Sequence, residues 1–137
     1  MINRCLNANP ILRPTSHDML SEIFSWILFS HIDNKDEPKA LDMIEKGGFD
    51  IDYKTRGFFG HVTALHLACK FECNEVVMAL IQEGANINAV EKEGNTPLHW
   101  AVKFGNNQLV ERFINAGANL DSENDQGQTP IFFACSQ

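Results

Sequence analysis

Apolar residues recur at helical spacing in the second half of the chain. They occupy positions i, i+1, i+4 and i+5 twice, first as Val76, Val77, Leu80 and Ile81 and then as Leu109, Val110, Phe113 and Ile114. This spacing places each set on one stripe of a helix that faces a neighbouring element. Gly84 and Gly117 follow the stripes, and glycine ends helices readily because it adopts the left-handed conformation at little cost. The pattern predicts two similar helices, each followed by a polar loop.

A second, shorter helix is predicted before each stripe. The segments TALHLA, TPLHWA and TPIFFA begin at Thr63, Thr96 and Thr129, so the register is a constant 33 residues. Threonine is a good N-cap, and proline at the first helical position removes no donor that the helix needs. Turns at Glu72 and Gly105 then separate the short helix from the longer one. The sequence is therefore a tandem array of helix pairs.

The period and the T-P-L-H element resemble the ankyrin repeat family, whose unit of about 33 residues contains two helices. The resemblance covers residues 27–137 and implies an all-α ankyrin-repeat solenoid with an N-terminal capping helix. Its units are a degenerate cap at 27–52, full repeats at 63–95 and 96–128, and a truncated repeat at 129–137. In the family, the histidine of the element bonds to neighbouring loops, which implies this role for His66 and His99. Phe132 stands where the third histidine would be and should weaken the last loop network.

The degenerate unit is recognised by an offset of 36 residues. Gly48 to Asp52 match Gly84 to Asn88, and Ala40, Leu41 and Ile44 then fall on the apolar stripe. Asp36-Glu37-Pro38 is an acidic, proline-containing helix start. Terminal repeats are commonly atypical because one side faces water, so this unit is expected to cap the array.

The first 26 residues resemble a different family. The string CLNANPILRPT from Cys5 to Thr15 is similar to the segment that joins the last two helices of the eukaryotic protein-kinase fold. The sequence has no kinase glycine-rich loop, V-A-I-K lysine, H-R-D loop or D-F-G motif. The chain is therefore predicted not to be an enzyme. One alternative is that it is the C-terminal fragment of an ankyrin-repeat protein kinase, and another is that the short match is due to chance. A helix from about Thr15 to His31 is expected to merge with the first repeat.

Composition narrows the classes of partner. The 137 residues carry a formal charge of −7, which disfavours nucleic acid and anionic lipid surfaces, and no apolar run approaches the roughly 20 residues of a membrane span. The four cysteines and five histidines show no metal-ligand spacing. We expect free thiols in a reducing, cytoplasmic setting, no metal, no cofactor and a protein partner.

Candidate partner-binding residues lie where ankyrin repeats vary, at the loop tips and at the outward ends of the first helices. At the loop tips they are Lys92, Glu93, Asn95, Asp125, Gln126 and Gln128; on the helices they are Lys70, Phe71, Lys103 and Phe104. The two phenylalanines occupy matching positions one repeat apart and either contact a partner or pack against neighbouring helices. Phe58 and Phe59, in the inserted loop 53–62, either contact a partner or fold back onto the first repeat.

The truncated last unit suggests self-association. Its second helix is missing, so the stripe from Leu109 to Ile114, with Phe132 and Phe133, is expected to be incompletely covered. Exposed apolar ends of solenoids promote association, so we expect either concentration-dependent self-association or further repeats in the natural full-length chain.

Overall fold

The computed structural model describes residues 16–55 and 60–136, and the side chains from residue 22 onward. Within this part the regular structure is helical, without strands. The helices are α2 (Ser16–Asp33), α3 (Glu37–Lys46), α4 (Ala64–Lys70), α5 (Asn74–Gln82), α6 (Pro97–Lys103), α7 (Asn107–Asn115) and α8 (Pro130–Cys135). The predicted all-α class is confirmed.

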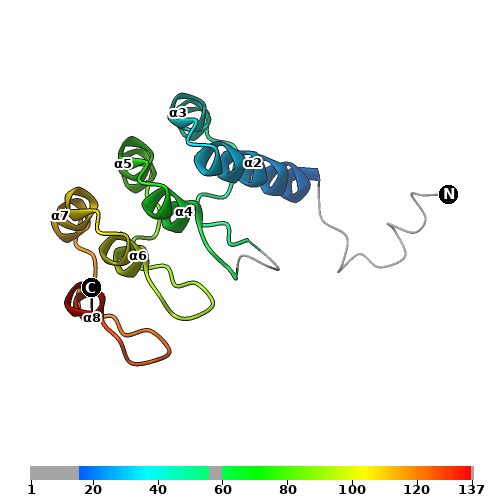
Figure 1. The fold of residues 1–137 in the computed structure, drawn as a ribbon. Helices are drawn as coiled ribbons and strands as arrows, with labels where there is room; N and C mark the ends of the chain where they lie inside the picture. Colours follow the sequence, from blue (N-terminus) through cyan, green and yellow to red (C-terminus); the bar gives the residue numbers. More distant parts are fainter. Residues whose placement is uncertain (1–15, 56–59, 137) are drawn as a thin grey trace, which may run out of the picture.

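The helices form two parallel rows (Figure 1). α2, α4, α6 and α8 pack successively in one row, and α3, α5 and α7 form the other. Within a unit, α2 packs on α3, α4 on α5 and α6 on α7. The loops that connect successive units project from the row that contains α4 and α6 (Figure 1). We call this row the inner row and the other the outer row. The arrangement is the predicted solenoid.

The helix boundaries follow the predicted local chemistry. Thr63, Thr96 and Thr129 are extended N-cap residues, with proline at the start of α6 and α8. The turn between the two helices of a repeat needs a left-handed residue, which is Gly105 (φ 73°) in one repeat and Glu72 (φ 61°) in the other. Glycine adopts this conformation without the steric strain that glutamate meets.

One buried core runs through the units. Its central members come from both helices of each repeat, and the largest fully buried apolar side chains are Leu28, Ile32, Val62, Leu65, Val76, Val77, Leu80, Leu109 and Phe113. Each unit therefore relies on its neighbours for burial, as expected for a solenoid.

The first unit consists of α2 and α3. Ala40 and Ile44 are buried and Leu41 is half-buried, which confirms the predicted stripe. α2 ends at Asp33, close to the expected His31, and it packs on both α3 and α4, so the predicted merging with the first repeat is confirmed. The start of the expected helix at Thr15, and the segment that resembles a kinase, lie outside the described residues.

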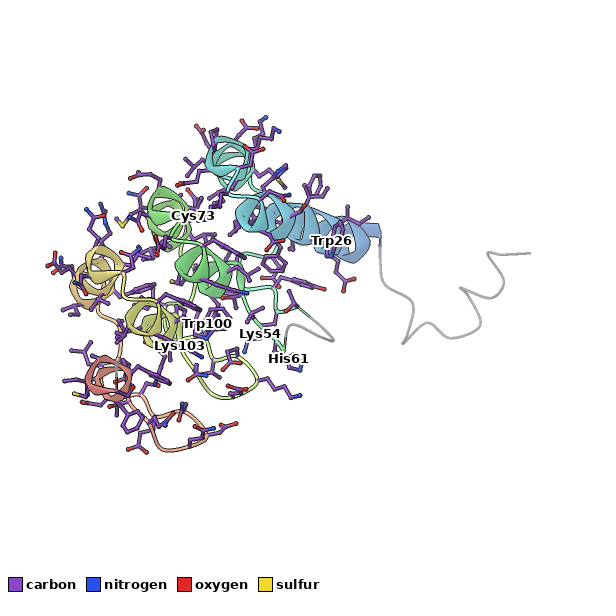
Figure 2. All side chains as sticks on the ribbon, in the orientation of Figure 1. Trp26, Lys54, His61, Cys73, Trp100 and Lys103 are labelled. Carbon is purple, nitrogen blue, oxygen red and sulfur yellow. The ribbon has the colours of Figure 1, made fainter. Side chains whose placement is uncertain are left out.

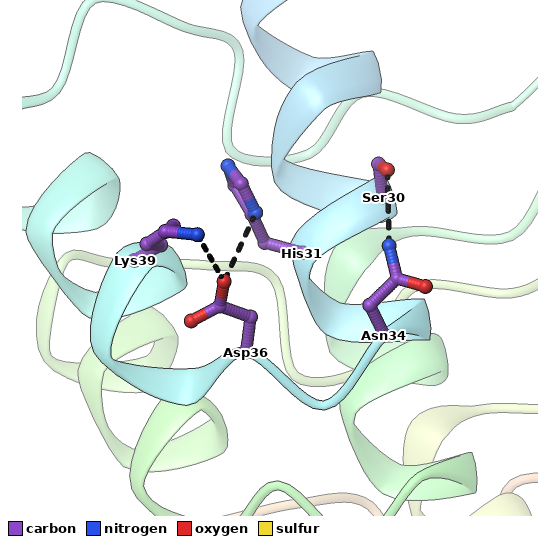
Figure 3. A network of polar contacts seen from close by, with 5 residues as sticks. All are labelled: Ser30, His31, Asn34, Asp36 and Lys39. Carbon is purple, nitrogen blue, oxygen red and sulfur yellow. Dashed lines mark hydrogen bonds and ion pairs between the residues drawn. The ribbon is translucent and has the colours of Figure 1, made fainter.

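A small polar cluster fixes the turn between α2 and α3 (Figure 3). Asp36, the N-cap residue of α3, pairs with Lys39 Nζ at 2.8 Å, and its carboxylate lies 3.9 Å from His31 Nδ1. The hydrogen bond from Lys39 holds the pKa of Asp36 below its usual value. Asp36 therefore pairs with side chains and does not cap the helix with its own carboxylate.

The prediction that the C-terminal stripe is incompletely covered is confirmed. Leu109 and Phe113 are fully buried, whereas Ile114 is 48% exposed and Val110 is half-buried. α7 packs on α5 and α6, so Leu109 and Phe113, four positions apart, share the covered side. Val110 and Ile114 are one position further around the helix; Val110 still packs against the edge of the core, whereas Ile114 faces away from it. Ile131 and Phe132 on α8 are also exposed.

Candidate protein-binding surface

Hydrogen bonds between successive loops support the projecting side of the solenoid. The Lys92 amide donates to the Gly60 carbonyl at 2.8 Å, and the Asp125 amide donates to the Glu93 carbonyl at 2.9 Å. Asn124 Nδ2 donates to Asn95 Oδ1 at 2.9 Å. These bonds join residues about one repeat apart, so the loops form a continuous, ordered surface beside the inner helices.

Two buried histidines tie the inner helices to the loops. His66 Nδ1 accepts from the Thr63 amide at 3.3 Å, so the proton of the neutral ring lies on Nε2, which donates to the Asn95 carbonyl at 3.0 Å. His99 repeats the arrangement with Thr96 and with the Gln128 carbonyl at 2.9 Å. The resemblance implied these roles, and both are confirmed.

Burial keeps both histidine rings neutral. Desolvation lowers the pKa of His66 to about 4 and also lowers that of His99, because burial penalises the charged ring. Neither ring is available as a base at a solvent-facing site. Burial also raises the pKa of the Cys69 and Cys73 thiols, which keeps them protonated and poorly nucleophilic.

The candidate binding residues divide into three groups. The side chains of Lys70, Lys92, Glu93, Lys103, Phe104, Asp125 and Gln126 are exposed, and those of Phe71 and Gln128 are half-buried. Asn95 is only 8% exposed and bonds to Glu91 and Asn124, so its side chain holds the loop and we leave it out of the binding surface. Phe58 and Phe59 lie outside the described residues.

The phenylalanines and lysines at the ends of the inner helices lie close to other aromatic rings. Lys70 Nζ lies 5.2 Å from the centre of the Phe71 ring, and Lys103 Nζ lies 6.0 Å from that of Phe133. The Phe104 ring packs edge-on against Trp100, with 6.1 Å between ring centres. We call Lys70, Phe71, Trp100, Lys103 and Phe104 the inner-row patch; Figure 2 labels Trp100 and Lys103.

Trp100 was not among the predicted partner-binding residues. It follows His99 in the T-P-L-H-W element, and its ring packs edge-on against His66 of the preceding repeat at 5.3 Å between ring centres. A tryptophan immediately after the histidine could have been noticed as a large, half-buried residue on the inner row.

A second hydrophobic feature lies between α2 and α4. Trp26 on α2 is 70% exposed and borders an open pocket that also includes Thr55 and Leu67. The Thr55 hydroxyl is buried and, alone among the buried side-chain oxygens and nitrogens of the described residues, has no hydrogen-bond partner. No sequence motif indicated this pocket.

Replacing Thr55 by valine tests the state of this hydroxyl. Valine has nearly the same shape without a polar atom, and an unpaired buried hydroxyl costs about 1–3 kcal/mol. Thr55→Val is therefore expected to raise the free energy of unfolding by about 1 kcal/mol in urea denaturation. Thr63→Val, which removes a hydroxyl bonded to His66 at 2.9 Å, should lower it. A loss of stability in Thr55→Val would show that the hydroxyl is paired in solution.

Other chemistry is sparse in the described part of the chain. It contains no group of three or more His, Cys, Asp or Glu side chains that could hold a metal ion. Cys69, Cys73 and Cys135 are free thiols. Among the helices that the structure describes, none combines the length and the apolar character that crossing a membrane requires.

Paired helices in two rows, histidine-tied loops and a 33-residue period define a helical-repeat protein. The family description "Ankyrin repeats (3 copies)" matches residues 28–123, and the chain therefore belongs to the ankyrin repeat family. Ankyrin repeats indicate a protein-interaction module, and the family is generally non-catalytic. No curated protein matches the sequence significantly.

Proposed function

We propose that the chain is a non-catalytic adaptor that binds a protein partner through the inner-row patch and the adjacent loop tips. The observation that carries the proposal is the inner-row patch itself, in which aromatic rings and lysines occupy equivalent places in successive repeats. Aromatic residues are enriched among those that dominate binding energy. The exposed Lys92, Glu93, Asp125 and Gln126 of the loops would form a polar rim around it.

The test compares two double variants of the same chain. Lys103→Ala/Phe104→Ala removes exposed inner-row side chains, whereas Glu111→Ala/Asn115→Ala removes exposed side chains of α7 in the outer row. Loss of one central aromatic contact commonly costs about 2 kcal/mol of binding free energy, or about 30-fold in affinity. We expect that loss for the inner-row variant only, measured by titration calorimetry with a partner isolated from cells. Equal affinity of both variants would contradict the proposal.

We further propose that the C-terminal end self-associates. Ile114, Ile131 and Phe132 are 48%, 69% and 48% exposed, and they lie on α7 and α8 at the end of the array. Sedimentation velocity should show a concentration-dependent increase in mass, which Ile131→Lys/Phe132→Lys removes. A strict monomer at high concentration would overturn this proposal.

A second candidate function is supported by the segment from Cys5 to Thr15, which resembles the end of a protein kinase. In this reading the chain is the C-terminal part of an ankyrin-repeat kinase, whose catalytic part is encoded upstream and is targeted by the repeats. Sequencing the genomic DNA upstream of Met1 tests it, since in-frame kinase motifs are expected and a stop codon would exclude it. In either case we propose a cytoplasmic location, which the buried free thiols of Cys69 and Cys73 favour.

A further inference from the structure

An open pocket of about 180 Å³ lies between α2 and α4, the first two helices of the inner row. Six residues line it: Trp26, Phe29, Ser30, Asp33, Thr55 and Leu67. The four from α2 are spaced i, i+3, i+4 and i+7, which places them along one side of that helix. Figure 2 shows Trp26 on the exposed part of α2. The pocket is thus built by two units and by the chain segment that joins them.

The size of the pocket limits what it can hold. A cavity of about 150 Å³ lined by apolar side chains holds benzene, whereas sites for drug-sized ligands have about 300–1,000 Å³. The pocket volume of about 180 Å³ therefore suits one large side chain and is too small for a cofactor. Trp26, Phe29 and Leu67 give it mainly apolar walls.

Thr55 lines the pocket but offers it no polar group. The residue is 9% exposed, and its hydroxyl oxygen is itself buried and has no partner. A ligand in the pocket therefore does not reach this oxygen, and the contact with the pocket is mainly apolar.

The charges along the rim favour a cation. Asp33 is exposed and makes no hydrogen bond or ion pair with any described side chain. Glu22, also exposed, lies four residues before Trp26 and thus on the same side of α2. The nearby cation Lys54 donates to the Val90 carbonyl at 2.9 Å, which directs it toward the next loop.

We propose that this pocket binds a phenylalanine- or leucine-sized side chain of a protein partner, next to a lysine or arginine of the partner that faces Asp33. That the ligand is part of a protein rests on the proposed function. The pocket is separate from the inner-row patch and supplies a second, chemically specific contact.

Three small probes of matched shape test the pocket without a partner. Phenylalaninamide is cationic, N-acetylphenylalaninamide is neutral and N-acetylphenylalanine is anionic; all carry a phenyl ring and an amide. In ¹H–¹⁵N spectra of the full chain, the indole N–H of Trp26 is the readout and that of Trp100 is the internal control. A Trp26→Phe variant assigns the two signals.

We expect saturable chemical-shift changes of the Trp26 indole N–H with a Kd of about 1–10 mM. The binding free energy per non-hydrogen atom limits molecules of this size to such affinities. Affinity should fall from cation to neutral probe to anion, and Asp33→Asn should remove the preference for the cation. Ser30→Phe, which fills the pocket from a half-buried position on α2, should abolish the shifts and leave the Trp100 signal in place.

Two results would overturn the proposal: absence of a saturable Trp26 shift with any probe, or equal binding by Ser30→Phe. Lys103→Ala/Phe104→Ala lies outside the pocket and should bind the probes like the unmodified protein. Because the probe experiment needs no partner, its failure leaves the test of the inner-row patch unaffected, and the two failures are distinguishable.

Discussion

Replacing Phe113 by alanine is expected to lower the free energy of unfolding by about 3–5 kcal/mol. The Phe113 side chain is fully buried on the side of α7 that packs against α5 and α6. Removing its ring leaves a cavity in addition to the lost apolar burial. Domains of this size are commonly stable by only about 5–15 kcal/mol, so the variant should unfold at a much lower urea concentration.

Phe132→Ala is the matched control for this prediction. Phe132 is 48% exposed, and the same truncation there should cost less than about 1 kcal/mol, as at most surface positions. Urea denaturation followed by circular dichroism measures both variants. Equal losses would contradict the structure, in which Phe113 is fully buried and Phe132 is about half exposed.

Acidification is expected to destabilise the fold through His66. Its pKa is about 4 in the folded protein, against 6.5 for the unperturbed residue. When the pKa of a histidine is lower in the folded state than in the unfolded state, the neutral ring stabilises the fold. This contribution to the free energy of unfolding is fully present at pH values above the unfolded-state pKa. That stability is lost as the pH falls from about 6.5 toward 4, and the shift corresponds to about 3 kcal/mol when complete. His99 contributes in the same direction.

The His66→Asn variant isolates this effect. It should be less stable than the unmodified protein at about pH 7.5, because it loses the buried bonds to Thr63 and Asn95, but its stability should change less between about pH 7 and 5. Denaturation curves at several pH values provide the comparison. Identical pH dependence of the two proteins would show that His66 does not titrate as its burial requires.

Local and periodic chemistry made much of the fold predictable. The Thr63 and Thr96 helix starts, the turns at Glu72 and Gly105, and the histidine bonds depend on residues close in sequence or one repeat apart. The 33-residue period therefore placed α4 to α7 and their loops. The same period predicted the exposed lysines of the inner row, because they occupy equivalent positions in successive repeats.

The features that the sequence did not reveal depend on packing between units. The contacts that α5 and α6 make with α7 decide which residues of the α7 stripe are covered. Apolar spacing alone does not show that Phe113 is buried and Ile114 exposed. The pocket at Trp26 is formed by residues of α2, by Leu67 of α4 and by Thr55. The 33-residue period does not relate these residues to one another. Asn95 lies in a variable loop, but its side chain turns inward to bond to Glu91.

Site-specific photocrosslinking in cells tests the central claim most directly, that the inner row binds a protein partner. A photoreactive amino acid replaces Phe104 in the inner row or, as the control, Glu111 on α7; both positions are exposed. We expect a discrete crosslinked product from position 104 that Lys70→Ala/Phe71→Ala reduces, and none from position 111. Crosslinks from position 111 alone, or a product at 104 that the double variant leaves unchanged, would contradict it.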